Sequence, residues 1–345
     1  MRQRHSHWTH MLLCLLLGLL CIPVASARSI IVKLATAAPD GSIWHKGLKE
    51  MGQQWNESTE GAVSLRIYAG GVVGDESAMV RKMGLGQLDA ATLTSVGLAE
   101  IDPAFQVLGM PLFYGSYEEL DHVLAALEPT LKKKLEARGY IFLSWVYAGW
   151  AHFFSTEPVR QAEDLKKLKI YTSAGEDRMV QLYKANGFRP VALATTDVLI
   201  GLQTGMIEAL PTPPIAALLL QWFRSTPYML DEGLAPLVGC LVATRRGWNK
   251  IPANYHASVL RSAERLGERL RQEIPSQDQK SLEEMKTRGL TVTTIHKHKM
   301  KEWQILASSF ADKMRGTLVP QDIFDLALQA RKEFQMRAAS AGGSD

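Results

Sequence analysis

Residues 164–214, DLKKLKIYTSAGEDRMVQLYKANGFRPVALATTDVLIGLQTGMIEALPTPP, decide the fold because strands and helices alternate along them. The segment 168–171 reads as a short strand, and residues 177–186 carry apolar side chains at helical spacing before a glycine that suits a helix C-terminus. A second strand follows that glycine, a second helix covers residues 196–203, and residues 206–210 form a strand that ends at a proline cluster. This alternation predicts an α/β unit.

The same order occurs earlier in the chain. Residues 65–68 read as a strand, a glycine turn follows, and residues 76–85 read as a helix that leads into Gly86 and an apolar segment. Two copies of one arrangement predict two α/β lobes built alike, with the ends of their strands facing a shared cleft. Such an architecture binds something between its lobes.

The first 27 residues have the features of an export signal. Arg2 and Arg4 give a positive start, residues 11–22 are continuously apolar, and Ala25-Ser26-Ala27 is a small-x-small cleavage site. The apolar run is short for a membrane span. We therefore expect cleavage near Ala27 and a periplasmic product.

Charge and cysteine content narrow the classes of function. The formal net charge of the 345-residue chain is +4, and removal of the leader leaves +2, which does not point to nucleic acid. Cys14 and Cys21 lie in the leader, so Cys240 alone remains and no intrachain disulfide is possible.

The remaining elements divide between the two expected lobes. We assign residues 28–150 plus about 240–280 to lobe I and residues 151–239 plus about 281–337 to lobe II, with a disordered tail at 338–345. The strongly apolar residues 215–223 predict a long helix that bridges the lobes. A second long helix is expected at about 254–273, and a shorter separate helix at 282–286.

Several of these segments together resemble a known family. They are Leu34-Ala35, Pro39-Asp40-Gly41-Ser42 with Trp44, Tyr68-Ala69-Gly70, residues 164–170, residues 202–209, and Trp248. In this order they are similar to the solute-binding subunits of tripartite ATP-independent periplasmic (TRAP) transporters of the DctP type. The resemblance implies a type II-like two-lobed periplasmic binding protein fold, a bridging helix, closure over a ligand, delivery to membrane permease subunits, and neither catalytic residues nor a cofactor.

The chain departs from this family at three polar positions. The resemblance implies an arginine after the Leu-Lys-Ile run, where this chain has Tyr171, and a second arginine where it has Ala151. An asparagine expected before a proline corresponds to Thr212. A buried carboxylate without a paired cation is costly. We therefore expect a neutral or largely apolar ligand instead of a dicarboxylate.

The expected ligand contacts combine aromatic faces with a few polar groups at strand ends. The predicted binding residues are Tyr147, Trp150, Ala151, Phe154, Tyr171, Thr195, Leu210, Thr212, Asp75 and Thr94. Each aromatic side chain has the alternative of an ordinary core residue, and Asp75 that of a helix-start acid.

Other candidate residues have simpler interpretations. Arg178 is the alternative source of the lost positive charge, although a solvated helix face accounts for it more simply. His296 and His298 form a His-x-His pair without a third ligand nearby, so we expect no metal site. Cys240 lies in an apolar strand and is expected to be a buried small hydrophobe.

Two other classes of function compete with a transport receptor. An exported hydrolase lacks support because the chain has neither Gly-x-Ser-x-Gly nor His-Glu-x-x-His. An exported scaffold or sensor with the same fold would act through a protein partner, and the resemblance makes a tetratricopeptide-repeat protein one such partner. An exposed apolar face at residues 215–223 would favour this alternative.

Overall fold

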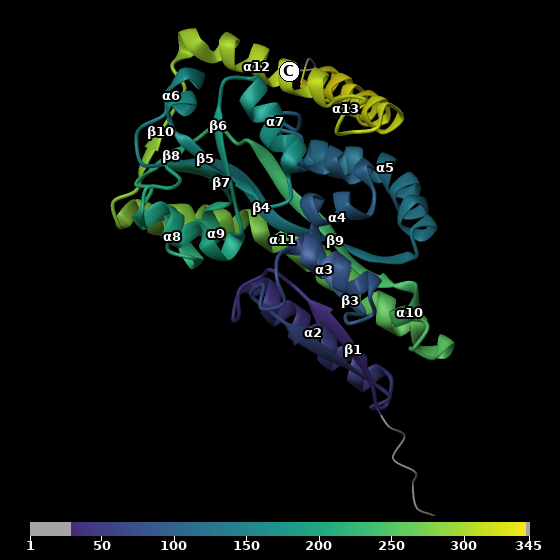
Figure 1. Cartoon of the computed structure of the whole chain (residues 1–345). Coiled ribbons are helices and arrows are strands. Elements are labelled where there is room, and N and C mark those ends of the chain that lie inside the picture. Colours follow the sequence, from purple (N-terminus) through teal and green to yellow (C-terminus); the bar gives the residue numbers. More distant parts are fainter. Residues whose placement is uncertain (1–28, 343–345) are drawn as a thin grey trace, which may run out of the picture.

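The computed structural model describes residues 29–342, in which ten strands form two sheets that share one long strand (Figure 1). The expected leader and its cleavage site lie outside the described residues. The strands are β1 (Ile30–Ala35), β2 (Val63–Tyr68), β3 (Ala90–Thr94), β4 (Tyr140–Ser155), β5 (Lys169–Ser173), β6 (Arg189–Leu193), β7 (Ala209–Thr212), β8 (Tyr228–Leu230), β9 (Ala235–Thr244) and β10 (Thr291–Thr293).

Helices cover both sheets. The α-helices are α2 (Ile43–Ser58), α3 (Glu76–Gly84), α4 (Ser95–Ile101), α5 (Tyr117–Ala137), α6 (Ala162–Lys167), α7 (Asp177–Ala185), α8 (Val198–Gln203), α9 (Pro214–Leu219), α10 (Arg245–Trp248), α11 (His256–Thr287), α12 (Met300–Met314) and α13 (Gln321–Gly342). Short 3-10 helices lie at η1 (Pro103–Gly109), η2 (Thr195–Asp197), η3 (Trp222–Arg224), η4 (Ala253–Tyr255) and η5 (Lys297–Lys299).

The two sheets define two lobes. In the first lobe the strand order is β2-β1-β3-β9-β4, with β1 parallel to both β2 and β3 and with β9 antiparallel to its neighbours. In the second lobe the order is β4-β7-β5-β6, with β5 parallel to β6 and β7. Parallel strands joined through helices place their carboxyl ends at one edge, where α/β proteins bind ligands. The α/β fold predicted from the alternating pattern is confirmed.

Strand β4 connects the lobes. Its residues from Tyr140 to Ala151 pair with β9, and its residues from His152 to Ser155 pair with β7. The register shifts between Tyr147 and Gly149, so the strand is irregular where it leaves the first sheet. This irregular segment is the place where the lobes are joined.

Helices α2 and α3 form where the sequence predicts them. The hydroxyl of Ser42 accepts a hydrogen bond from the His45 N–H (3.2 Å), and the carboxylate of Asp75 accepts one from the Ala78 N–H (2.8 Å). Both side chains satisfy N–H groups that a helix start leaves unpaired. Trp44, Leu48, Met51 and Trp55 follow the helical period and are all buried.

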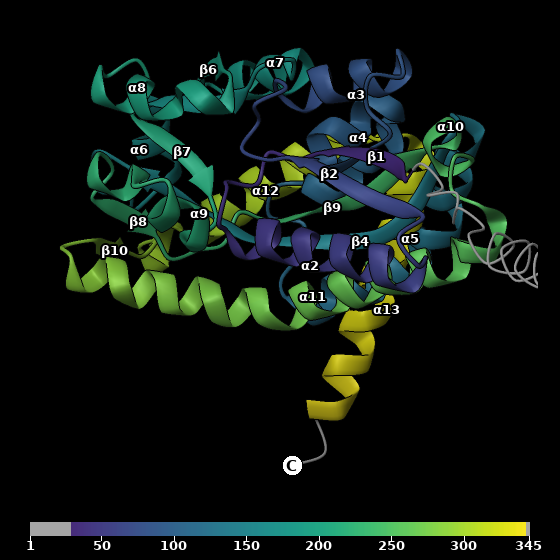
Figure 2. The same ribbon diagram turned by 90° about the horizontal axis from the view of Figure 1, so that it is seen from below.

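The predicted position of the bridging helix is wrong. Helix α9 has only six residues and ends before Gln221, whose backbone is left-handed (φ 58°), while residues of this segment such as Ala217 and Trp222 pack into the core of the second lobe. The long helix is α11, with 32 residues, and it includes both the helix expected at 254–273 and the one expected at 282–286. In Figure 2 it runs horizontally beneath α2 and β10.

A proline inside α11 explains this error. Pro275 lacks the N–H that a helix interior needs, so the sequence pattern favours a break there. The helix nevertheless continues, because Leu270, Ile274 and Met285 on either side of the proline are buried against the two lobes. Packing of an apolar face outweighs the local preference of one residue.

The end of the chain is also more helical than predicted. Helix α13 continues to Gly342, so residues 338–342 are helical and the expectation of a disordered tail is wrong for them. Residues 343–345 lie outside the described part. Residues 162–167, just before β5, form the short helix α6.

Gly149 occupies the irregular segment of β4 with a left-handed backbone (φ 123°). A Cβ atom there would lie 2.5 Å from Cβ of Pro213 and 2.6 Å from Oδ2 of Asp278. A residue with a side chain would therefore meet both an unfavourable backbone conformation and two close contacts.

We predict that Gly149→Ala lowers the free energy of unfolding by about 2 kcal/mol or more, as measured by urea denaturation. The matched control is Gly139→Ala. Gly139 is also left-handed (φ 83°), but a Cβ atom there would have no heavy atom within 4 Å. The control should lose only about 1 kcal/mol, and equal losses in the two variants would show that the contacts at Gly149 do not constrain the fold.

Candidate ligand-binding site

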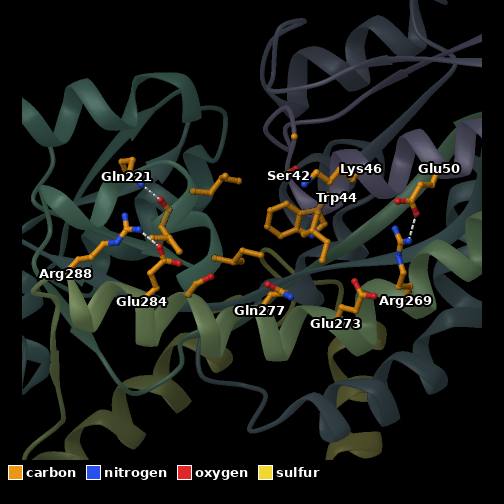
Figure 3. A pocket seen from close by; sticks show the side chains of 16 residues that line it. Ser42, Trp44, Lys46, Glu50, Gln221, Arg269, Glu273, Gln277, Glu284 and Arg288 are labelled. Atoms are coloured by element: carbon orange, nitrogen blue, oxygen red, sulfur yellow. Dashed lines mark hydrogen bonds and ion pairs between the residues drawn. The ribbon is translucent and has the colours of Figure 1, made fainter.

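A groove of about 620 Å³ lies between the two lobes (Figure 3). One wall comes from α2 and the turn before it, including Ser42, Trp44 and Lys46, and the opposite wall comes from α9 and Gln221. Helix α11 forms the floor. The groove therefore draws on the first lobe, the second lobe and the bridging helix together.

Four charged groups in the groove neutralise one another in pairs. Arg269 pairs with Glu50, and Arg288 pairs with Glu284, as the dashed lines in Figure 3 show. Lys46 and Glu273 also line the groove, and neither forms an ion pair within residues 29–342. One cation and one anion of the groove are thus available to a ligand.

The wall formed by α2 is fixed to β4, the strand that joins the lobes and is called the hinge strand below. The indole N–H of Trp44 donates a hydrogen bond to the Tyr147 carbonyl on β4 (2.9 Å), and the Trp44 side chain is buried. A buried indole needs such a partner because an unpaired N–H is costly away from water. Trp44 therefore holds the start of α2 against the strand that joins the lobes.

Asp278 on α11 holds three segments together beneath the groove. Its Oδ2 accepts a hydrogen bond from the backbone N–H of Trp150 on β4. Its Oδ1 accepts one from the backbone N–H of Ile215 on α9, and each distance is 3.0 Å. Burial raises the pKa of Asp278 to about 6, although the two hydrogen bonds oppose this shift. The hinge strand, the bridging helix and the second lobe thus meet at one carboxyl group.

A second group of polar residues gathers at the strand ends. The hydroxyl of Tyr171, in the middle of β5, lies 3.2 Å from that of Thr195 and 3.4 Å from that of Ser173. From the first lobe, Glu76 accepts hydrogen bonds from the Thr94 N–H and hydroxyl and from the Gly97 N–H. The structure therefore brings together Tyr171 and Thr195, two of the predicted ligand contacts.

The lobes approach each other beside this group. A Cβ atom on Gly175 of the second lobe would lie 3.1 Å from the Ser77 hydroxyl of the first lobe. The neighbouring Glu176 is largely buried, and burial raises its pKa to about 7, with a further contribution from the charge of Glu76. Two carboxyl groups from opposite lobes thus oppose close approach when both are ionised.

The structure places the other predicted site residues in several different surroundings. Phe154 and Leu210 face each other across β4 and β7 in the core of the second lobe, and both are fully buried. Tyr147 is buried and its hydroxyl donates to Asp121. The Trp150 ring packs edge-on against Tyr117, with centroids 5.1 Å apart.

The remaining predicted residues lie in strands β4 and β7 and at helix starts. Ala151 and Thr212 are buried within the strand pairings of β4, and Asp75 and Thr94 cap α3 and α4. None of the ten predicted residues lines the groove. Arg178 is exposed on α7 and forms no ion pair within the described residues. The assignment of ligand contacts stays a prediction.

The sequence analysis missed the residues that do line the groove. Ser42 and Trp44 carried a signal, because they follow the Pro39-Asp40-Gly41 turn that also contributes to the family resemblance. The charged residues of α11 carried none, because a helix face rich in Arg and Glu is usually solvated. Only the fold shows which of them face α2.

Two lobes joined by a hinge strand and a long helix, with a groove between them, define a two-lobed solute-binding protein. The model of the bacterial extracellular solute-binding protein family 7, DctP, matches residues 34–316. The chain belongs to this family, and the resemblance inferred from the sequence is confirmed.

Relatives and solved structures agree with this assignment. The chain is 23% identical over 273 residues to the 2,3-diketo-L-gulonate-binding periplasmic protein YiaO of Escherichia coli, covering 78% of this chain and 82% of the relative. A TRAP periplasmic solute-binding protein from Xanthobacter autotrophicus with bound β-D-galacturonate has a TM-score of 0.80 and 20% identity, covering 87% of this chain and 99% of that one. One from Haemophilus influenzae with bound L-gulonate has a TM-score of 0.80 and 18% identity, covering 88% and 99%.

The ligands of these neighbours correct one expectation. Galacturonate and gulonate are carboxylic acids, and the neutral or largely apolar ligand predicted from Tyr171, Ala151 and Thr212 is contrary to them. The prediction considered only three strand-end positions. It did not consider a positively charged side chain that contacts the ligand from another element.

Residues 29–342 contain neither a candidate membrane-spanning helix nor a cluster of metal ligands. Within residues 29–342, no helix combines the length and apolar character needed to span a membrane. The same residues contain no group of three His, Cys, Asp or Glu side chains arranged for a metal. The rings of His296 and His298 stack with centroids 5.4 Å apart.

We predict that Asp278→Ala lowers the free energy of unfolding by about 2 kcal/mol, because the N–H groups of Trp150 and Ile215 lose their acceptor. Urea denaturation at pH 8 measures this change. Lys280→Ala, an exposed change on the same helix, is the control and should leave the value within about 0.5 kcal/mol. An Asp278→Ala protein as stable as the control would refute the role of this carboxylate.

We predict a pH-dependent effect at Glu176. Its folded pKa of about 7 exceeds the ordinary value of 4.5, so its contribution to stability is present at low pH and is lost as the pH rises through about 7. Glu176→Gln removes the buried charge and should raise Tm at pH 8 by about 2–4 °C, with a smaller gain at pH 5. Thermal unfolding at pH 5 and pH 8 measures the change in Tm, and Glu157→Gln is the exposed control. Equal gains in Tm at both pH values would contradict the raised pKa of Glu176.

Proposed function

We propose that this chain is the periplasmic receptor of a TRAP-type transporter, that it binds a small organic acid between its lobes, and that it delivers the acid to membrane permease subunits. The observation that carries the proposal is the match to solute-binding protein family 7 over residues 34–316, together with a groove formed by both lobes. A volume of about 620 Å³ is within the range of small-molecule sites.

The acid class is supported by the relatives. YiaO of Escherichia coli is named for 2,3-diketo-L-gulonate, and the two solved neighbours hold galacturonate and gulonate. All three compounds are sugar acids of similar size. The chain offers a cluster of hydroxyl groups at Tyr171, Ser173 and Thr195, which suits a ligand with several hydrogen-bonding positions.

The proposal includes export and the absence of catalysis. A signal peptide cleaved near Ala27 would deliver the chain to the periplasm, where its family acts. Family 7 proteins bind solutes, and we propose no reaction for this chain. The tetratricopeptide-repeat partner and the lobe boundaries at about residues 150 and 240 stay predictions.

We predict that galacturonate, gulonate or a related sugar acid raises Tm of the purified protein in a concentration-dependent way, because a ligand that binds only the folded state stabilises it. Differential scanning fluorimetry with a panel of sugar acids tests this, with galactose as the neutral counterpart of galacturonate. Saturation at 100 times Kd corresponds to about 2.7 kcal/mol. Stabilisation by galactose but by none of the acids would contradict the proposed function.

A further inference from the structure

Two carboxyl groups from opposite lobes lie where the lobes come together. Glu76 is the first residue of α3 in the first lobe, and Glu176 directly precedes α7 in the second. The backbone beside Glu176 is close to the first lobe, because a Cβ atom on Gly175 would lie 3.1 Å from the Ser77 hydroxyl and 4.0 Å from the Glu100 carboxylate. Neither Glu76 nor Glu176 forms an ion pair with a Lys, Arg or His side chain within residues 29–342. Both carboxyl groups therefore lack a counter-ion at this junction.

Glu76 is held as a hydrogen-bond acceptor. Its Oε2 receives the N–H of Thr94 (3.0 Å), the hydroxyl of Thr94 (2.8 Å) and the N–H of Gly97 (2.8 Å). Burial raises the pKa of Glu76 and the charge of Asp75 adds to this shift, whereas the three hydrogen bonds oppose it. A proton on Glu76 would weaken these hydrogen bonds, so the junction takes up a proton at the other carboxyl group.

Glu176 has fewer donors. It accepts a backbone hydrogen bond from Ser173 at 3.3 Å. Burial raises its pKa to about 7, and the charge of Glu76 across the junction adds to this shift. Glu176 is thus the group whose protonation relieves the repulsion between the lobes.

The other titratable groups around Glu176 do not offset its charge. On its own lobe, Tyr171 and Tyr183 are neutral phenols, because burial raises the pKa of each and the charge of Glu176 adds to both shifts. Asp177 and Arg178, the next two residues of α7, are exposed, so water and salt screen their charges. A proton is therefore the compensation that the junction itself can provide.

We propose that Glu76 and Glu176 share one proton when the lobes close, so that closure over the ligand takes up a proton and the affinity for the ligand rises as the pH falls. The inference rests on the proposed function and adds a regulation to it. A bound acid brings a third negative charge between the lobes, and Tyr171 and Ala151 supply no cation for it. The proton on Glu176 lowers the total charge that closure must bury.

The size of the effect follows from the two protonation states. When the lobes separate, Glu176 is hydrated and distant from Glu76, so its pKa returns toward the ordinary value of 4.5. The extra stability of the closed form is then fully present below pH 4.5 and is lost as the pH rises through about 7. The ratio of closed to open protein should increase about tenfold from pH 8 to pH 6.

Isothermal titration calorimetry with galacturonate at pH 6 and pH 8 tests this inference, because the carboxyl group of the ligand is ionised at both values. The unaltered protein should bind about tenfold more tightly at pH 6 than at pH 8. Titrations at pH 6 in two buffers with different heats of ionisation should show an uptake of about one proton per ligand.

Glu176→Gln should bind galacturonate with equal affinity at both pH values and without this proton uptake, because the amide does not titrate. Asp177→Asn is the matched control. It removes an exposed carboxylate from the adjacent position, so it should keep both the tenfold difference and the proton uptake.

The outcomes separate this inference from the proposed function. If the unaltered protein binds galacturonate equally at pH 6 and pH 8, or if Glu176→Gln keeps the tenfold difference, the shared proton is overturned while the acid receptor stands. If the unaltered protein binds neither galacturonate nor gulonate at either pH, both are overturned. Loss of the difference in Glu176→Gln with retention in Asp177→Asn supports the shared proton, and loss in both variants overturns it.

Discussion

The structure depends on one buried carboxylate that joins three distant parts of the chain. Asp278 of α11 accepts hydrogen bonds from the N–H groups of Trp150 on β4 and Ile215 on α9. A buried carboxylate is costly unless its oxygens are paired, and here each oxygen receives a backbone donor. Gly149 permits this arrangement because it has no Cβ atom between Asp278 and Pro213. Any relative movement of the lobes must preserve or break these contacts.

Much of the fold could be predicted because it depends on local sequence. The strands and helices of residues 164–214 follow from apolar spacing and glycine positions, and α2 and α3 begin at Ser42 and Asp75 because those side chains pair with free N–H groups. The family resemblance added the two-lobed arrangement. These features need no knowledge of distant contacts.

The bridging helix and the groove could not be predicted in the same way. Pro275 favours a break in α11, and only burial of that helix against both lobes keeps it continuous. The ion pair between Glu50 and Arg269 joins residues far apart in sequence, so the free charges of the groove emerge only after folding. Tyr171 was predicted as a ligand contact from the family resemblance, and its contact with Thr195 emerges only from the pairing of β5 with β6.

The ligand question shows why single positions are weak guides to binding chemistry. The neutral ligand was inferred from the absence of arginine at 171 and 151, whereas solved neighbours with the same fold hold sugar acids.

Pulsed electron paramagnetic resonance on the whole chain tests most directly the claim that the lobes close over an acid. Spin labels at Ser58 on α2 and Gln203 on α8, both exposed and in different lobes, report the separation of the lobes, and the buried Cys240 should stay unlabelled. The account predicts that saturating galacturonate shifts the distances to a shorter and narrower distribution. A distribution unchanged by galacturonate and by gulonate would contradict it.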